Sequence, residues 1–337
     1  MQDMRKTLVA VIIPNWNGKE FLNTCLHSIE AQTMTSLIIV VDNGSTDGSQ
    51  ELIRSSFPNI HLISLDKNYG FVGGVNPGIS YAISQNIPFV ALFNNDAMAD
   101  TAWLSKLYDE ITSNDTIGIV ASKIRHFEGS LLDSTGEEYS VWGLPFARGR
   151  DEIDTGQYDT QQEIFSASGG ASMYRSEMLS KIGLFDQRFF AYFEDVDISF
   201  RAQLSGWRVR YQPTAVVYHR IGGTSGRHPG LSRFHSVKNY HYIFIKNMPL
   251  SLMIRFAPRY IVMILLMIGS DFRRGLLKEN FRANAVAFKE LPSLLKDRHS
   301  IQRRATVSSA YILSLLYKQL PPTQRSIYKL RRRLIGR

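Results

Sequence analysis

The sequence predicts an α/β fold in which helices cover both faces of a mostly parallel sheet. Over the first hundred residues, short apolar runs rich in β-branched residues alternate with segments whose apolar residues recur at helical spacing. The strand-like runs show no polar alternation, which is typical of strands buried on both faces. With 337 residues, 44% of them hydrophobic, the chain is long enough for one large domain, or for two with a modest appendage.

The expected elements follow one another in order along the chain. Strands are expected at residues 8–13, 37–41, 60–65 and 89–93, and helices at 18–32, 49–57 and 76–84. Residues 130–162 are polar and lack periodicity, so an irregular or mobile segment is expected there. Regular structure is expected to resume at 166–184 and 188–207, followed by short strands at 209–211 and 215–218 and a flexible loop at 222–226.

Polar residues follow each of the first four expected strands. These clusters are Asn15-Trp16-Asn17, Asp42-Asn43, Lys67-Asn68 and Asn94-Asn95-Asp96. In open parallel sheets, ligands bind beyond the carboxyl ends of the strands. The four clusters therefore predict a ligand site at one edge of the sheet, although Asn and Asp also form turns without any ligand.

The charge of the chain is concentrated near its end. Residues 249–337 hold 18 Lys and Arg against four Asp and Glu, whereas residues 1–248 carry a small net negative charge. An apolar octet at 261–268 lies between basic residues and is shorter than the ~20 residues of a spanning helix. This pattern favours a basic amphipathic helical region lying on an anionic membrane surface. The alternative is an amphipathic helix packed on the body, followed by a solvated basic terminus.

Two further features limit the class of protein. The single cysteine, Cys25, excludes an internal disulfide and a cysteine-rich zinc site. The basic tail has no known nucleic-acid module and its apolar octet suits lipid better, so a nucleic-acid partner is not expected.

Five blocks of sequence resemble the family 2 glycosyltransferases. They are VIIPNWNG (11–18), VDNGSTDGS (41–49), NYGFVGGVN (68–76), FNND (93–96) and FFAYFEDVDISFR (189–201), with His219 downstream. Within the family, the chain looks most like the bacterial rhamnosyltransferase-type members. The resemblance implies a Rossmann-like GT-A fold over residues 1–248, an inverting hexosyltransferase mechanism and a nucleotide diphosphate sugar donor.

The resemblance also implies a metal site. Asn95 and Asp96 fall in the family's metal motif, whose last acidic residue binds the ion that bridges the diphosphate, and His219 would complete the site. An oxygen donor with an imidazole suits Mn²⁺ or Mg²⁺, the imidazole favouring Mn²⁺. Two positions of the motif are Asn and Met98 stands where some members have an acid, which leaves Asp96 as the principal carboxylate. Without the family context, Asn-Asn-Asp is also a common helix N-cap.

The acidic pair Glu194-Asp195 supplies the expected catalytic base. The family places its general base at the second acid, so we expect Asp195 in this role, with Glu194 as the alternative. Apolar surroundings and an acidic neighbour raise the pKa of a carboxylate, which suits a base that deprotonates a hydroxyl. Acids at this position also favour a helix N-terminus without any catalytic role. Asp197 is expected to pair with Arg201 one helical turn later.

The remaining expected site residues bind the nucleotide sugar. By resemblance, Asp42 contacts the nucleoside, and the other positions line the pocket or approach the sugar diphosphate: Pro14, Asn15, Asn17, Asn43, Lys67, Asn68, Gly73, Gly74 and Asn76. A turn in which the Asp42 side chain bonds the backbone is compatible with this role.

The sequence and its resemblance therefore predict transfer of a sugar to a glycan or lipid-linked acceptor during cell-surface polysaccharide synthesis. L-rhamnose from dTDP-rhamnose is the leading donor, and the cytoplasmic side of the cell membrane is the expected location. Alternatives are a UDP-sugar donor (galactofuranose or another hexose), a non-catalytic nucleotide-sugar-binding module, or a nucleotidyltransferase. The last usually has a basic Gly-rich loop after its first strand, which Asn15-Trp16-Asn17-Gly18 does not provide.

Overall fold

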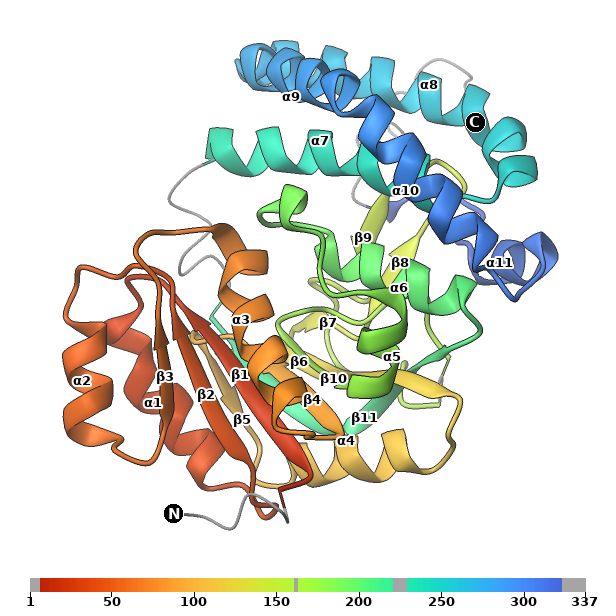
Figure 1. Ribbon diagram of the computed structural model, residues 1–337. Coiled ribbons are helices and arrows are strands. Elements are labelled where there is room, and N and C mark those ends of the chain that lie inside the picture. Colours follow the sequence, from red (N-terminus) through yellow and green to blue (C-terminus); the bar gives the residue numbers. More distant parts are fainter. Residues whose placement is uncertain (1–6, 161–162, 221–228, 323–337) are drawn as a thin grey trace.

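The computed structural model of the chain describes residues 7–160, 163–220 and 229–322. The expected loop at 222–226 lies outside these residues. One twisted sheet runs through the body, helices lie on both of its faces, and helices from the last third of the chain form a separate layer at one end (Figure 1). The predicted α/β class is confirmed.

Within the described residues the main sheet has nine strands in the order β3-β2-β1-β4-β10-β6-β11-β5, and β7 pairs with β6. Strands β8 and β9 form a separate hairpin. The strands are β1 Val9–Asn15, β2 Leu37–Asp42, β3 His61–Ser64, β4 Phe89–Phe93, β5 Ala97–Ala99, β6 Ile117–His126, β7 Leu132–Ser134, β8 Glu137–Tyr139, β9 Pro145–Ala147, β10 Ala171–Arg175 and β11 Arg208–His219.

The helices fall into a body set and a terminal set. The body set is α1 Lys19–Glu30, α2 Ser49–Ser56, α3 Gly70–Ser84, α4 Trp103–Thr112, α5 Ser176–Ile182, the 3₁₀ turn η2 Gln187–Phe189 and α6 Glu194–Leu204. The terminal set is α7 Pro229–Asn247, α8 Leu250–Arg274, α9 Leu277–Lys289, α10 Leu291–Arg303 and α11 Ser309–Leu315.

The first half of the sheet is parallel, as the sequence predicts. Strands β3, β2, β1 and β4 all run in the same direction, so their carboxyl ends meet at one edge. Beyond β4 the sheet is mixed, because β10 runs antiparallel to both β4 and β6 and β5 runs antiparallel to β11.

The two faces of the sheet bury separate cores. Along β1, Val9, Val11 and Ile13 contribute to the core under α1 and α4, whereas Ala10 and Ile12 contribute to the core under α3, α5 and α6. Alternate side chains of a strand point to opposite faces. A continuously apolar strand therefore contributes side chains to both cores.

The structure corrects three expectations. Residues 130–162 are not irregular where described, because they contain β7 and the β8–β9 hairpin and bury Tyr139 completely. Helix α3 begins at Gly70, six residues before its expected start, because its glycines fit close against β1. The two short strands at 209–218 are one strand, β11, interrupted by a register shift between Gln212 and Val216.

The terminal helices are packed on the body. Helix α7 lies between α6 on one side and α9 and α10 on the other, and Tyr260 of α8 stacks on Phe244 of α7 with ring centroids 4.1 Å apart. The division into residues 1–248 and 249–337 remains a prediction.

Candidate active site

The polar residues that follow β1, β2 and β4 meet at the carboxyl edge of the sheet. The amide of Asn95 donates to Asn15 Oδ1 at 2.7 Å, and Asn15 Nδ2 donates to Asp42 Oδ2 at 3.0 Å. These side chains come from three adjacent strands and are buried. The juxtaposition expected from the sequence is therefore present, and its hydrogen bonds fix the shape of the edge.

Asp42 is fully buried beneath this edge. Its Oδ1 accepts hydrogen bonds from Ser45 N at 3.0 Å and from Gln50 Nε2 at 2.8 Å, so the expected side-chain-to-backbone turn is present. Asn17 sits beside this turn and accepts a hydrogen bond from Thr46 N at 2.8 Å. Together with the bond from Asn15 to Oδ2, Asp42 accepts three hydrogen bonds from the described residues, and Oδ2 keeps capacity for one more.

Several expected sugar-diphosphate residues hold the start of α3 in place. Asn43 donates to Asn68 Oδ1 at 3.1 Å and to Gly70 O at 2.8 Å. A Cβ on Gly74 would lie 2.9 Å from Pro14 Cβ, so this glycine is required for close packing of α3 on β1.

Three other expected residues, Asn76, Gly73 and Lys67, differ in how accessible they are to a ligand. Asn76 uses both of its amide atoms on the backbone of Phe185, at 2.8 and 3.2 Å, which gives it a structural role. Gly73 is partly accessible in the first turn of α3, and Lys67 is exposed. Gly73 and Lys67 are therefore the two of this group that remain open to a ligand.

The expected metal-binding pair lies together because β5 pairs with β11. This pairing places Ala97 opposite His219, and His219 Nε2 lies 3.1 Å from Asp96 Oδ1. Asn94 Nδ2 lies 3.4 Å from the same His219 nitrogen. Asp96 also lines a small open pocket with Phe127 and Arg220.

Sequence reasoning missed Asp133, which orients His219. Its Oδ2 lies 2.8 Å from His219 Nδ1, and its Oδ1 accepts from Arg150 at 2.6 Å. Burial lowers the pKa of His219, but the hydrogen bonds to Asp133 and Asp96 outweigh it and raise this pKa to about 9. Asp133 lies on β7, inside the segment expected to be irregular, and this three-residue strand is buried throughout, so no periodicity in the sequence could have indicated it.

The residues at this point fit a divalent cation. With Nδ1 bonded to Asp133, His219 directs Nε2 toward Asp96, as in a metal-bound histidine oriented by a carboxylate. The carboxylates of Asp96 and Asp133, both within 3.1 Å of the His219 ring nitrogens, provide the negative charge that a cation needs here. Among the described residues no group of three His, Cys, Asp or Glu forms a complete metal site, so diphosphate oxygens and water would supply the other ligands.

The acidic pair occupies the first turn of α6. Asp195 is partly buried, and its carboxylate accepts from Gly169 N at 2.9 Å and from Val196 N at 2.8 Å. Burial raises the pKa of Asp195, and these backbone donors limit the rise. The next residue, Gly170, accepts from Asn94 N at 2.9 Å. The loop that holds Asp195 therefore touches the Asn94–Asp96 segment directly.

Glu194 is placed less well for catalysis than Asp195. It is buried, and its Oε2 has no hydrogen-bond partner among the described residues. Burial, followed by the charge of Asp195, raises the pKa of Glu194 well above its usual value. These features favour a neutral Glu194 behind a reactive Asp195.

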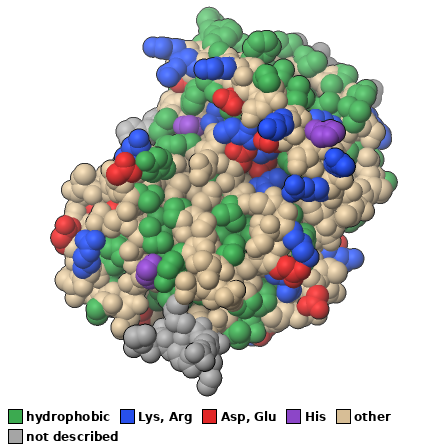
Figure 2. Space-filling view, in the orientation of Figure 1, with side chains coloured by type: hydrophobic (Ala, Val, Ile, Leu, Met, Phe, Trp, Pro, Cys, Tyr) green, Lys and Arg blue, Asp and Glu red, His purple; other side chains and the backbone are tan. Residues whose placement is uncertain are grey.

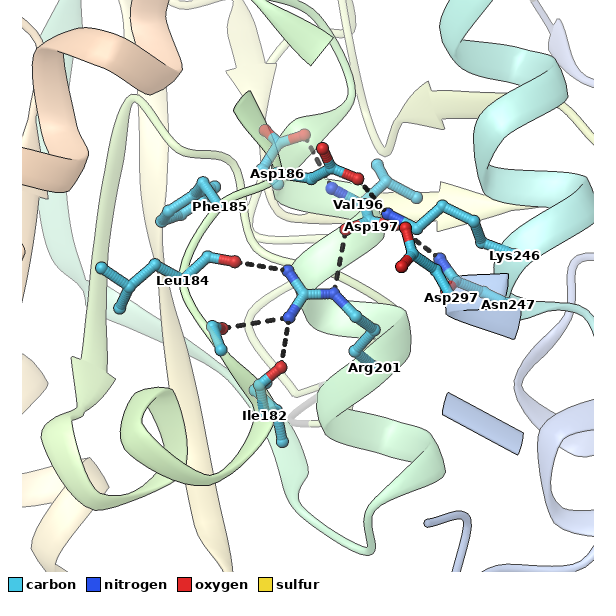
Figure 3. Close-up of polar contacts among 12 residues, drawn as sticks. Ile182, Leu184, Phe185, Asp186, Val196, Asp197, Arg201, Lys246, Asn247 and Asp297 are labelled. Carbon is cyan, nitrogen blue, oxygen red and sulfur yellow. Dashed lines mark hydrogen bonds and ion pairs between the residues drawn. The ribbon is translucent and has the colours of Figure 1, made fainter. Parts of the chain in front are cut away.

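A buried polar network anchors α6 to the helices around it (Figure 3). Asp197 pairs with Arg201 at 2.9 Å, as expected, and accepts from Asn247 at 2.9 Å. Arg201 also donates to the carbonyls of Ile182 and Leu184. Although burial opposes it, the positive charge of Lys246 and Arg201 lowers the pKa of Asp197. Arg201, in the last turn of α6, thus holds the helix against the backbone of residues 182–184, away from its first turn.

Comparisons with known proteins bear on the family and the fold. Residues 10–183 match the family model described as "Glycosyl transferase family 2". An N-acetylglucosaminyl-diphospho-decaprenol L-rhamnosyltransferase from Mycobacterium tuberculosis is 26% identical over 233 residues, covering 62% of this chain and 74% of the relative. The dTDP-rhamnosyl transferase RfbF from Shigella flexneri is 21% identical over 266 residues, covering 75% and 85%.

A solved structure supports the fold. The mannosyltransferase PcManGT from Pyrobaculum calidifontis, in complex with GDP-Man and Mn²⁺, superposes with a TM-score of 0.52 at 15% identity, covering 93% of this chain and 80% of that one. The shared architecture is the GT-A fold that the sequence resemblance implied.

Proposed function

Because the chain belongs to glycosyl transferase family 2, we propose that it is an inverting, metal-dependent transferase that moves one sugar from a nucleotide diphosphate donor to an acceptor hydroxyl. The observation that carries this proposal is the placement of the Asp96–His219 pair and of Asp195 on segments that touch at the carboxyl edge of the sheet. The Asp96–His219 pair suits a diphosphate leaving group, and Asp195 suits an acceptor hydroxyl.

In the proposed reaction, Asp195 takes the proton of the acceptor hydroxyl as its oxygen attacks the anomeric carbon. The bond from that carbon to the diphosphate breaks on the opposite face, so the configuration inverts. Asp96 and His219 would hold Mn²⁺ or Mg²⁺, and a cation there would supply charge stabilisation to the departing diphosphate. Gly169 and Val196 orient the base through their backbone N–H groups.

We propose dTDP-rhamnose as the donor and a lipid-linked glycan as the acceptor, at the cytoplasmic face of the cell membrane. The two rhamnosyltransferase relatives support the sugar, and the decaprenol-linked acceptor in the name of the mycobacterial relative supports the lipid. Transfer from dTDP-β-L-rhamnose to such an acceptor, followed by NMR of the product, tests the reaction. We expect an α-linked product. A β-linkage would contradict inversion, and no product from any nucleotide sugar would contradict the proposal.

The outermost helices support a membrane surface as a partner. Large apolar side chains are exposed on α8 and α9, among them Ile261, Leu265, Phe272, Phe281 and Phe288. We call this set the apolar platform. Exposed basic residues on the same two helices stand among its members: Arg255, Arg259, Arg273, Arg274, Lys278, Arg282 and Lys289. Figure 2 shows hydrophobic and basic side chains intermixed at this end of the molecule.

The packing of α8 favours lying on a membrane over crossing one. By length and composition α8 is apolar enough to span, which the octet alone did not indicate. However, Phe256, Tyr260, Met263 and Met267 bury one face of the helix on the body. Asp271, also buried on α8, pairs with Arg233 at 2.6 Å. A helix held on one side by its own protein presents only its other face to lipid.

Replacing the three phenylalanines of the platform with serine should release the protein from vesicles. Burial of one such side chain contributes about 1.5–3 kcal/mol, so we expect the Kd for phosphatidylglycerol-containing vesicles to rise at least ~10-fold. Co-sedimentation measures it, with Ile153→Ser as a control because Ile153 is also exposed but lies on the body. Unchanged binding by the triple variant would contradict the membrane role of the platform.

A further inference from the structure

A strained turn leads into the first residues of α6. Phe190, Tyr192 and Phe193 all have positive φ, at 65°, 72° and 66°, and none is glycine. Such conformations cost of order 1–3 kcal/mol each and persist only where their surroundings hold them. The residues that come next are Glu194 and Asp195, so the path of this turn sets where the proposed base lies.

Asn239 of α7 holds the turn from one side. Its Nδ2 donates to the carbonyl oxygens of Phe189, Ala191 and Tyr192, at 3.2, 2.9 and 2.7 Å. Asn239 is fully buried. The two N–H hydrogens of one side chain thus serve three carbonyls, one at the end of η2 and two in the irregular backbone that follows it.

Two further contacts come from α7. His235 stacks on Phe190 with ring centroids 4.7 Å apart, and Ser232 Oγ lies 2.6 Å from the hydroxyl of Tyr192. Helix α7 therefore contacts the turn through three side chains spaced along its length: Ser232, His235 and Asn239.

Helix α3 holds the turn from the other side. Val72 N donates to Phe190 O at 3.2 Å. A Cβ on Gly70, which has φ +76°, would lie 2.3 Å from the same oxygen, so only glycine allows this approach. The turn is thus held between α7 and the start of α3, which lies at the carboxyl edge of the sheet.

We propose that Asn239 is a positioning residue for the transfer reaction: by holding the 190–193 turn, it places Asp195 for proton abstraction. This role rests on the proposed function. It gives α7, a helix beyond the sheet and beyond the residues matched to the family model, a direct part in the geometry of the site. Asn239 itself touches no reacting atom.

The rest of α6 has separate anchors, so the role of Asn239 is separable from folding. Arg201, itself on α6, donates to the backbone carbonyls of Ile182 and Leu184, and Asn247 of α7 donates to Asp197 (Figure 3). Loss of Asn239 should therefore free the turn while leaving α6 docked. The expected consequence is a misplaced base in a folded protein that still binds its donor.

Asn239→Asp tests this inference. Aspartate has the same size, but it loses the N–H donors and sets a carboxylate against three carbonyl oxygens. We expect kcat to fall ~10–100-fold, because misplacement of a reacting group by about 1 Å has this effect. The KM for dTDP-rhamnose and the Mn²⁺-dependent Kd for this donor should stay within about twofold of the wild-type values. Asn239→Ser, which keeps one donor, should have intermediate kcat.

Asn284→Asp is the matched control, since Asn284 is a helical asparagine on α9 whose Nδ2 bonds within its own helix and whose Oδ1 bonds His241 of α7, and neither atom bonds the 190–193 turn. It should keep wild-type kcat. Wild-type kcat in Asn239→Asp, or an equal loss of kcat and donor affinity in the serine variant, would overturn the positioning role. If Asn239→Asp fails to fold, Asn239→Ser provides the test, and a lower kcat without a loss of donor affinity supports the positioning role. A wild-type protein that transfers no sugar overturns the proposed function, and the positioning role with it.

Discussion

Asp195→Asn should lower sugar transfer by several orders of magnitude while leaving donor binding nearly intact. The substitution keeps the size of the side chain but removes its capacity to accept the acceptor proton. General base catalysis contributes about 10²–10⁴-fold, so we expect kcat to fall by that factor. Transfer of labelled rhamnose measures kcat, and titration with donor and Mn²⁺ measures affinity.

Glu194→Gln is the comparison, because Glu194 is the neighbouring acid and is buried without a partner for Oε2. It should retain most of the transfer activity. The reverse pattern, with Asp195→Asn active and Glu194→Gln inactive, would reassign the base to Glu194. Loss of donor affinity with residual turnover in Asp195→Asn would instead assign Asp195 to donor binding.

The pH dependence of the wild-type protein follows from the same residue. A base acts in its deprotonated form, and burial raises the pKa of Asp195. Activity should therefore fall as the pH drops through this raised pKa and level off above it. In a plot of kcat against pH, the loss of activity on the acid side should therefore occur at a higher pH than an exposed aspartate would give.

Asp96→Ala should remove the metal dependence of donor binding and most of the activity. Asp96 is the only carboxylate within hydrogen-bond distance of His219 Nε2 among the described residues, so the variant leaves one protein ligand. We expect Mn²⁺ no longer to increase donor affinity. Asp133→Asn should weaken the Mn²⁺ effect by about 10–100-fold, the range typical of carboxylates that orient a metal-bound histidine.

The control for this series is Asp115→Ala, because the Asp115 side chain is fully exposed. It should behave as wild type. A donor affinity that depends on Mn²⁺ to the same degree in wild type and Asp96→Ala would show that the cation binds elsewhere.

The sequence alone predicts the parallel half of the sheet and the meeting of its polar strand ends. The prediction succeeds because β1, β2 and β4 are continuously apolar, and each one ends in, or is followed by, Asn or Asp. The contact between Asp96 and His219 is also predicted, although from the family pattern and not from periodicity, since the β5–β11 pairing joins segments more than a hundred residues apart.

What the sequence does not predict depends on tertiary packing. Strand β7 has only three residues, too short to show periodicity, so Asp133 is hidden in a polar segment. Asn239 lies in an ordinary helix, and its importance comes from the positive φ values of residues it touches across the fold. The early start of α3 depends on Gly74 fitting against Pro14, which no local propensity reveals.

The central claim, that the protein binds a nucleotide sugar through a divalent cation, is tested most directly by thermal unfolding with a panel of nucleotide sugars, with and without Mn²⁺. A donor at 100 times its Kd stabilises the native state by ~2.7 kcal/mol. We predict that dTDP-rhamnose raises the Tm, and that it does so only when Mn²⁺ is present. A folded protein whose Tm responds to no donor under either condition would contradict the account.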